Sequence, residues 1–294
     1  MIVEDFTIED ADILSNETFC VLSLHPWINV GNVAKIVVER LSKKFHSKKI
    51  GELHKPSEFY DYTRYRPKIV SNSFGRSLEI PNTKISLIRI NNAQVNIVFI
   101  QMLEPHMFSE KYNDSVISLL DFLKIKLYIL IGSMYDSVPH SRSLLVTGST
   151  NGLKPSDLPG INLSKSNYSG PTSITSQITD RVYKELGIST ISLIVHLPMY
   201  IKLDNDFSGA AKLLSVLLKI FKLDFDYPEQ ELGIEQYSQI TPALIGNDSL
   251  KDLVAKFEAD YDKQKVSDFE EYSLSPEVES FLKEISEERK EEKE

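Results

Sequence analysis

The chain has 294 residues, of which 41% are hydrophobic and 26% charged, a composition typical of a globular protein with an ample core. Its longest apolar runs, around residues 127–131 and 190–195, are far shorter than the roughly 20 residues that span a bilayer. The N-terminal residues are acidic, whereas a secretion signal begins basic and then turns apolar. A single cysteine, Cys20, excludes an internal disulfide and a cysteine-based zinc site. We therefore expect a cytoplasmic protein that does not bind a membrane.

The net charge of −9 is concentrated in the C-terminal part of the chain. Residues 251–294 contain 8 Lys and Arg against 15 Asp and Glu, a balance of −7, which leaves −2 for residues 1–250. The larger part of the chain shows no basic face of the kind that binds nucleic acid. We therefore expect no nucleic-acid partner.

The first half of the chain predicts an alternation of strands and helices. A strand at residues 18–24 is followed by a helix over 33–45, whose apolar residues recur at helical spacing and for which Asn32 is a candidate N-cap. Strands at 84–90 and 95–102 flank a short turn and predict a hairpin. A helix over 112–126 then leads into a continuously apolar strand at 127–132, which is typical of a parallel strand buried on both faces.

The second half continues the same pattern up to about residue 225. A short strand at 144–146 and a loop over 148–171 precede a helix over 174–187, which Gly187 should terminate. A strand at 190–196 and a strongly apolar helix from Gly209 complete the alternation. The pattern predicts a three-layer α/β/α sandwich, with residues 1–235 as one α/β domain.

Residues 236–294 are predicted to form a C-terminal helical extension with an acidic, frayed end. Two amphipathic helices are expected, over 249–264 and 276–288, each with an apolar stripe. Because such stripes are unfavourable in water, these helices need a surface to pack on, either the α/β body or a neighbouring subunit, and we expect a homo-oligomer.

Polar residues that could carry chemistry follow the buried strands. Asp136, His140, Ser141 and Arg142 lie just beyond the strand at 127–132, where open α/β sheets place their clefts. A histidine there could act as a base and an arginine could hold an anion. The alternative is that these residues only brace a loop. No Gly-x-Ser-x-Gly elbow, phosphate-binding glycine loop or His-Glu-x-x-His helix occurs, so no catalytic residue is assigned.

Other segments offer similar choices between a functional and a structural role. Trp27 could stack on a ligand or cover the core, and Glu104 with His106 could ligate a metal but lacks further ligands. The aromatic and basic residues between Tyr60 and Arg66 could contact RNA or form a half-buried loop. Tyr168 and Gly170 precede a helix that could offer N–H groups to an anion. If a cleft exists, it should be a modest polar pocket in which Arg142 pairs with Glu104, lined by Trp27, Asn29, Glu104, His140, Arg142, Tyr168 and Gly170.

Six short motifs occur in a fixed order along the chain. They are His25-Pro26-Trp27-x-x-Val30-Gly31, Glu58-Phe59-Tyr60-Asp61-Tyr62 with Arg66-Pro67, Glu104-Pro105, Pro139-His140-Ser141-Arg142, Tyr168-Ser-Gly170-Pro171-Thr172 and Leu197-Pro198-Met-Tyr200. In this order they resemble the proteasome assembly chaperone two family, and most closely its longer prokaryotic members with a helical C-terminal extension. The resemblance covers about residues 15–235.

The resemblance implies a fold similar to phosphorylases and peptidyl hydrolases, a homo-oligomer that is often a trimer, and no enzymatic activity. It implies proteasome-like or other ring subunits as partners. We also expect no cofactor and no metal. Archaeal relatives dock on the proteasome through a C-terminal hydrophobic–Tyr–any tripeptide, whereas this chain ends Glu292-Lys293-Glu294. We expect a non-enzymatic assembly or binding protein; the alternative is a small-molecule-binding protein or a hydrolase- or phosphorylase-like enzyme that uses a cleft at the strand ends.

Overall fold

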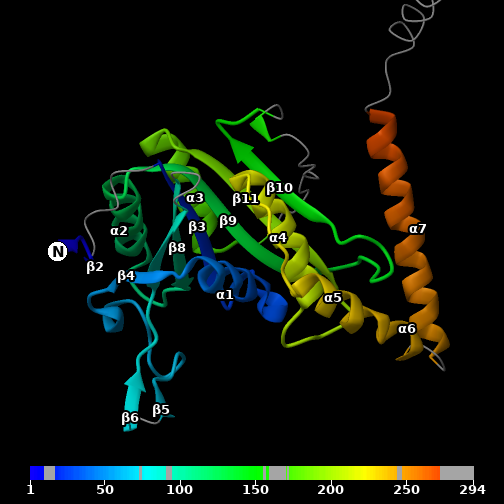
Figure 1. Ribbon diagram of the computed structural model, residues 1–294, viewed down its shortest axis with the longest axis horizontal. Coiled ribbons are helices and arrows are strands. Elements are labelled where there is room, and N and C mark those ends of the chain that lie inside the picture. The colour runs from blue at the N-terminus through cyan, green and yellow to red at the C-terminus, as the bar shows by residue number, and fades with distance from the viewer. Residues whose placement is uncertain are drawn as a thin grey trace, which may run out of the picture. The chain divides into compact units, whose positions relative to one another are not determined.

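The computed structural model describes residues 1–9, 17–72, 75–90, 95–154, 157–158, 170, 172–243 and 247–271. The chain divides into two compact units, Met1–Pro242 and Ala243–Glu294. The first unit contains the sheet and most of the helices (Figure 1). Among the described residues, no helix is both long and apolar enough to cross a bilayer.

A nine-stranded sheet forms the centre of the first unit within the described residues. In spatial order its strands are β1 (Ile2–Val3), β2 (Phe6–Ile8), β4 (Lys48–Leu53), β7 (Lys84–Ile90), β8 (Val95–Leu103), β3 (Glu17–His25), β9 (Ile125–Asp136), β11 (Ser189–Pro198) and β10 (Val146–Asn151). Strands β8, β3, β9 and β11 run parallel to one another. All other neighbouring strands of the sheet are antiparallel. The parallel strands therefore end at one common edge.

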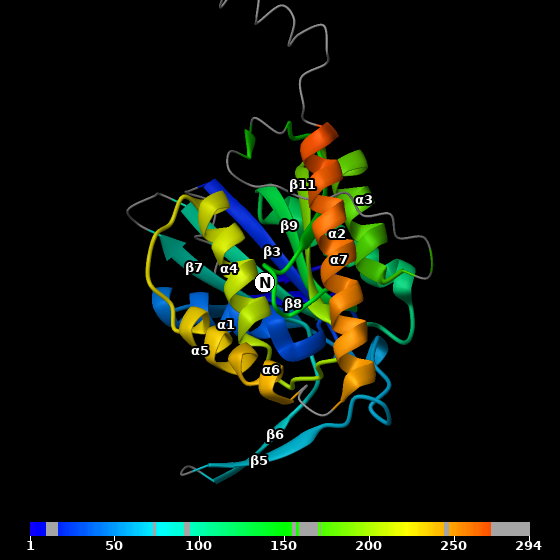
Figure 2. The same ribbon diagram turned by 90° about the vertical axis from the view of Figure 1, so that its right-hand side faces the viewer.

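Helices cover both faces of this sheet (Figure 2). Helices α2 (Ser109–Phe122) and α3 (Ile174–Leu186) pack on one face, where Tyr112, Val116 and Ile178 are fully buried. Helices α1 (Val33–Phe45) and α4 (Phe207–Phe221) pack on the other, through side chains such as Val37 and Leu214. This is the three-layer α/β/α sandwich that the sequence predicts.

Helix α5 (Glu229–Ser238) follows α4 and is tied to α1. Arg40 donates to both carboxylate oxygens of Glu229, at 2.8 and 2.9 Å, and Glu229 is almost completely buried. Gly233 lies against Ser208, where an added Cβ would come within 2.7 Å of the backbone. The short helix α6 (Ile240–Ala243) follows. The sequence pattern did not predict α5, because only Gly233, Tyr237 and Glu229 of its residues are buried.

A separate two-stranded sheet projects from the first unit. Strands β5 (Lys68–Asn72) and β6 (Gly75–Glu79) pair with each other and with no other described strand. Figure 1 shows this ribbon extending away from the main sheet. We call residues 67–80 the β5–β6 arm. The sequence analysis did not predict it.

The ends of the helices confirm one predicted cap and correct another. Gly187 ends α3 in the left-handed conformation, with φ of 65°, as predicted. Asn32 is not the side-chain cap of α1, because its own backbone is left-handed and its amide donates to the carbonyl of Asp204. The side chain of Asn29 acts instead, since its Oδ1 accepts from Ala34 N at 3.0 Å.

The predicted strands and helices up to residue 264 are present, with three main changes in extent. The helix predicted over 112–126 is α2 at Ser109–Phe122, and Ile125 and Lys126 belong to β9. Strand β9 continues to Asp136, so this residue ends a strand and does not begin a loop. The expected strand at 144–146 is β10 at Val146–Asn151, so it extends into the predicted loop. The hairpin between β7 and β8 is confirmed by their antiparallel pairing, although its turn at 91–94 lies outside the described residues.

The second unit contains one described helix, α7 (Asp248–Glu271), which confirms and lengthens the first predicted C-terminal helix. The second predicted helix, at 276–288, lies outside the described residues.

Candidate functional site

The carboxyl edge of the parallel strands brings together loops that are far apart in the sequence. His25 at the end of β3 is paired with Leu103 at the end of β8, and Asp136 at the end of β9 is paired with Pro198 at the end of β11. The chain segments that follow these strands therefore share one edge, as the sequence analysis expected. In α/β sheets this edge commonly carries the functional groups.

Glu104 follows β8 directly and is held by its backbone and its side chain. Its N–H donates to the carbonyl of His25 at 3.1 Å, and its own carbonyl accepts from the Tyr65 hydroxyl at 3.2 Å. Its Oε1 accepts from the N–H of Ile174, the first residue of α3, at 3.2 Å, while the buried Oε2 has no hydrogen-bond partner among the described residues. Burial raises the pKa of Glu104, and the bond from Ile174 opposes this effect only in part. Glu104 thus connects β8 to α3.

Trp27 and Asn29 lie in the loop after β3. The indole of Trp27 is 51% exposed, so Trp27 does not cover the core. The loop crosses β9 closely, because Ser133 N donates to the carbonyl of Ile28 at 2.9 Å and a Cβ at Gly132 would come within 2.6 Å of the same oxygen. The Asn29 side chain caps α1, so its role here is structural.

His140 and Arg142 lie beyond β9 in a loop that contacts the segment after β11. The Tyr200 hydroxyl accepts from the backbone N–H of His140 at 2.8 Å and lies 2.7 Å from its Nδ1. His140 is buried, and Arg142 Nη1 is 3.5 Å from the Ser141 hydroxyl. Among the described residues, no ion pair joins Arg142 and Glu104, so this prediction is wrong. Glu104 binds the start of α3 instead.

Asp136 pairs with a histidine that the sequence analysis did not consider. His196 Nδ1 lies 2.7 Å from Asp136 Oδ2, and His196 Nε2 lies 2.7 Å from the hydroxyl of Thr147. His196 and Thr147 are buried. The hydrogen bond from His196 lowers the pKa of Asp136, although partial burial acts in the opposite direction. The sequence signal was a histidine near the end of an apolar strand. The apolar pattern identifies the strand but assigns no role to the histidine.

Gly170 is exposed, and Tyr168 lies outside the described residues. The shared cleft of Trp27, Asn29, Glu104, His140, Arg142, Tyr168 and Gly170 therefore stays a prediction.

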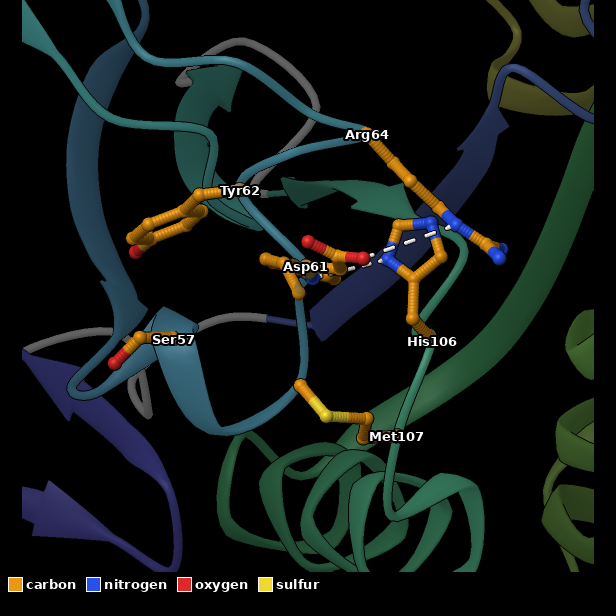
Figure 3. A pocket seen from close by; sticks show the side chains of 7 residues that line it. Ser57, Asp61, Tyr62, Arg64, His106 and Met107 are labelled. Atoms are coloured by element: carbon orange, nitrogen blue, oxygen red, sulfur yellow. Dashed lines mark hydrogen bonds and ion pairs between the residues drawn. The ribbon is translucent and has the colours of Figure 1, made fainter.

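A shallow pocket of about 470 Å³ opens beside the loop after β8 (Figure 3). It is lined by Ser57, Tyr60, Asp61, Tyr62, Arg64, His106 and Met107. Asp61 N donates to His106 Nδ1 at 3.2 Å, and the His106 ring lies 4.5 Å from that of Tyr65. His106 is thus engaged with this segment while Glu104 binds α3. No cluster of three or more potential metal ligands occurs among the described residues, so the Glu104–His106 pair gains no further ligand.

The aromatic residues between Tyr60 and Arg66 form a loop, one of the two alternatives expected. Tyr60 is buried and its hydroxyl joins those of Thr83 and Tyr112 at 2.6 and 3.1 Å, so it packs in the core and is not available to stack on a base. Burial raises the pKa of Tyr112 to about 12.

Large apolar side chains are exposed in the loops at the carboxyl edge. Trp27 follows β3, Met107 and Phe108 follow β8, and Met199 follows β11, with exposed fractions of 51%, 41%, 66% and 48%. Aromatic residues and methionine are enriched at protein interfaces. The edge therefore combines hydrogen-bonded polar side chains with an exposed apolar surface.

The fold and this edge define a three-layer α/β protein with the features of a binding module. The model of the PAC2 family matches residues 23–240, and the chain belongs to this family. The match confirms the resemblance to proteasome assembly chaperones that the sequence motifs indicate.

Solved structures share the fold at low sequence identity. A PAC2 family protein from Streptomyces avermitilis has a TM-score of 0.72 at 19% identity, covering 82% of this chain and 99% of that protein. A proteasome-assembly chaperone homologue from Mycobacterium tuberculosis has a TM-score of 0.71 at 20% identity, covering 81% and 99%. PbaB of Pyrococcus furiosus, an archaeal proteasome activator, has a TM-score of 0.61 at 14% identity, covering 82% and 99%. No functionally curated protein matches the chain.

Proposed function

We propose that this protein is a chaperone-like binding protein that assists the assembly of a ring-shaped protein complex, in the cytoplasm and without catalysing a reaction in that role. Membership of the PAC2 family supports the proposal. So does the similarity in fold to a proteasome-assembly chaperone homologue and to a proteasome activator. The structural observation that carries it is the β5–β6 arm.

The arm exposes an apolar face at a distance from the main sheet. Ile69 and Leu78 are directly opposite each other in the β5–β6 register, so their side chains share one face. Ile80, the residue that follows β6, is exposed as well. The exposed fractions of these side chains are 62%, 61% and 42%. A two-stranded ribbon is marginally stable alone in water, and a partner that covers this face would stabilise it.

The charge of the arm indicates the kind of partner. The arm itself contains two basic residues, Lys68 and Arg76, and one acidic residue, Glu79, and it is flanked by Arg64, Arg66 and Lys84, in a chain whose net charge is −9. Within the described residues, Arg66, Lys68 and Arg76 form no ion pair, whereas Lys84 pairs with Glu79 at 3.1 Å. We therefore propose that the arm docks on an acidic, apolar surface of a ring subunit.

Self-association is a second part of the proposal. The apolar stripe of α7 consists of Leu250, Leu253, Val254, Phe257 and Tyr261 at helical spacing. Val254, Phe257 and Tyr261 are buried within the single chain, whereas Leu253 is 37% exposed. We propose that it contributes to a homo-oligomer, with a trimer as the expected size.

The proposal is tested by affinity capture from the organism's own cells. The bait is the intact chain, compared with the double variant Ile69→Ser/Leu78→Ser, and captured proteins are identified by mass spectrometry. Ile234→Ser is the matched control, because Ile234 is 67% exposed on α5 and lies outside the arm. We expect subunits of one ring complex with the wild type and the control, and their loss with the arm variant. Equal capture of ring subunits by all three baits, or their absence from all three, would overturn the proposal.

A further inference from the structure

Three side chains from three neighbouring strands form a linear hydrogen-bonded chain beside the carboxyl edge. Asp136 ends β9, His196 lies near the end of β11, and Thr147 is the second residue of β10. The carboxylate is 2.7 Å from His196 Nδ1, and the hydroxyl is 2.7 Å from His196 Nε2. The proposed binding function does not use these three hydrogen-bonded side chains.

The direction of the hydrogen bonds follows from the chemistry of the three groups. An ionised carboxylate can only accept, and the lowered pKa of Asp136 keeps it ionised. His196 Nδ1 must therefore donate to Asp136. In the neutral imidazole Nε2 is then an acceptor, and the Thr147 hydroxyl donates to it. The proton on Thr147 thus points at a base that a carboxylate orients.

We propose that Asp136, His196 and Thr147 form a latent acyl-transfer site for short-chain carboxylic esters, with Thr147 as the nucleophile. The order of carboxylate, imidazole and hydroxyl is that of Asp–His–Ser triads, which occur on unrelated folds and are recognised by geometry. His196 acts as the general base and then as the general acid. Asp136 is a positioning residue that fixes the tautomer of His196.

The strand that carries Thr147 also supplies an N–H group suited to a developing oxyanion. His196 N donates to the carbonyl of Leu145. The backbone N–H and C=O groups of residues 145 and 147 therefore point to β11, and those of residues 146 and 148 point away from it. β10 is the outermost strand of the sheet in the described part of the chain. The N–H of Gly148, the residue after the nucleophile, therefore points to the open side of β10. Such an N–H is the usual donor to a tetrahedral intermediate.

The proposed reaction balances with an ester and water as the reactants. The Thr147 oxygen bonds to the acyl carbon while its proton passes to His196 Nε2. The bond from that carbon to the alkoxy group then breaks, and the leaving alkoxide takes the proton from His196. Water next attacks the acyl-threonine, gives a proton to His196, and releases the carboxylic acid as Thr147 is reprotonated.

The burial of the site limits the substrate. Thr147 and His196 are each only 7% exposed, so a bulky acyl group cannot reach the hydroxyl without displacement of neighbouring side chains. Asp136 is the most accessible of the three, with 42% of its side chain exposed. Acetyl esters are accordingly the appropriate probe.

The test is acetylation of the intact protein by p-nitrophenyl acetate. Peptide mass spectrometry locates the acetyl group, and release of p-nitrophenol gives the rate. We expect an acetyl adduct on Thr147 in the wild type and in Thr147→Ser. Thr147→Val, which keeps the shape of the side chain but removes the nucleophile, should lose the adduct and at least about 100-fold of the rate, no less than the loss of a general base would cause. His196→Gln should show a similar loss.

The control is Thr150→Val on the same strand, which should retain the rate and the adduct. Circular dichroism and thermal unfolding confirm that each variant is folded. An adduct confined to lysines, or equal rates for the wild type and Thr147→Val, would overturn the proposal and assign the three residues to strand packing alone. Because the arm is not involved, the arm variant should acetylate normally, so this test and the capture experiment fail independently.

Discussion

His196 on β11 and Asp136 at the end of β9 are joined by a 2.7 Å hydrogen bond that favours the ionised carboxylate. This bond is the main cause of the lowered pKa of Asp136. A carboxyl whose pKa is lower in the folded state contributes stability above its ordinary pKa of about 3.9. That contribution is lost as the pH falls through the lowered, folded-state value.

Asp136→Asn should therefore be less stable than the wild type at pH 7, and the difference should disappear towards pH 2. Urea unfolding across this range measures it. Asp121→Asn is the control, because Asp121 and its partner Lys124 are each 64% exposed and such pairs contribute little. A difference that persists unchanged at low pH would show that the substitution disturbs packing and that the charge is not responsible.

Glu104 should show the opposite pH dependence, because burial raises its pKa. Ionisation then costs stability in the folded state above the ordinary glutamate pKa of about 4.3. Glu104→Gln keeps an oxygen to accept from Ile174 and removes the charge at the unpartnered Oε2. We expect the variant to be more stable than the wild type at pH 7 and equal to it at pH 3. Greater stability of the wild type at pH 7, measured by urea unfolding, would contradict this.

The Arg40–Glu229 pair should be the most sensitive ion pair among those described. Arg40→Met leaves the carboxylate of Glu229, only 4% exposed, without its partner. Breaking such a buried pair typically costs about 3–5 kcal/mol. Lys35→Met is the matched control on the same helix, because the pair of Lys35 and Glu39 is 3.9 Å apart and exposed, and we expect a loss below about 0.5 kcal/mol. If chemical denaturation shows equal losses in the free energy of unfolding for Arg40→Met and Lys35→Met, this prediction is wrong.

Self-association should depend on the apolar stripe of α7. Leu253→Asp places a charge on that stripe at a side chain that is 37% exposed in the single chain, and burial of an unpaired charge in an oligomer interface is costly. We expect the intact protein to sediment as a trimer at micromolar concentration and the variant to sediment as a smaller species. Lys256→Gln, at an exposed position outside the stripe, serves as the control. Sedimentation of the wild type as a monomer would contradict the proposal.

The sequence predicted the parts of the fold whose signal is local. The strand at 127–132 and the helix at 174–187 could be identified because continuous apolarity and helical spacing reflect burial directly. The arm was missed because Ile69 and Leu78 are exposed, so no burial pattern marks their strands. The extent of β9 was underestimated because its last residues are only partly buried.

The site was harder to predict, because its contacts join residues distant in the sequence. The predicted parallel strands place Glu104 and Asp136 at one edge. They do not identify the hydrogen-bond partners of these two residues. Asp136 has His140 four residues away, yet it binds His196, sixty positions along the chain. Only the register of β9 against β11 brings that pair together, and periodicity does not encode register.

Site-specific photo-crosslinking in the organism's own cells shows directly whether the β5–β6 arm docks on a ring subunit. A photoreactive amino acid replaces Leu78 in one strain and, as a control, Ile234 in another. After irradiation, crosslinked products are identified by mass spectrometry. We expect crosslinks from position 78 to a subunit of a ring complex, and none to that subunit from position 234. The same products from both positions, or no ring subunit from position 78, would contradict the proposal.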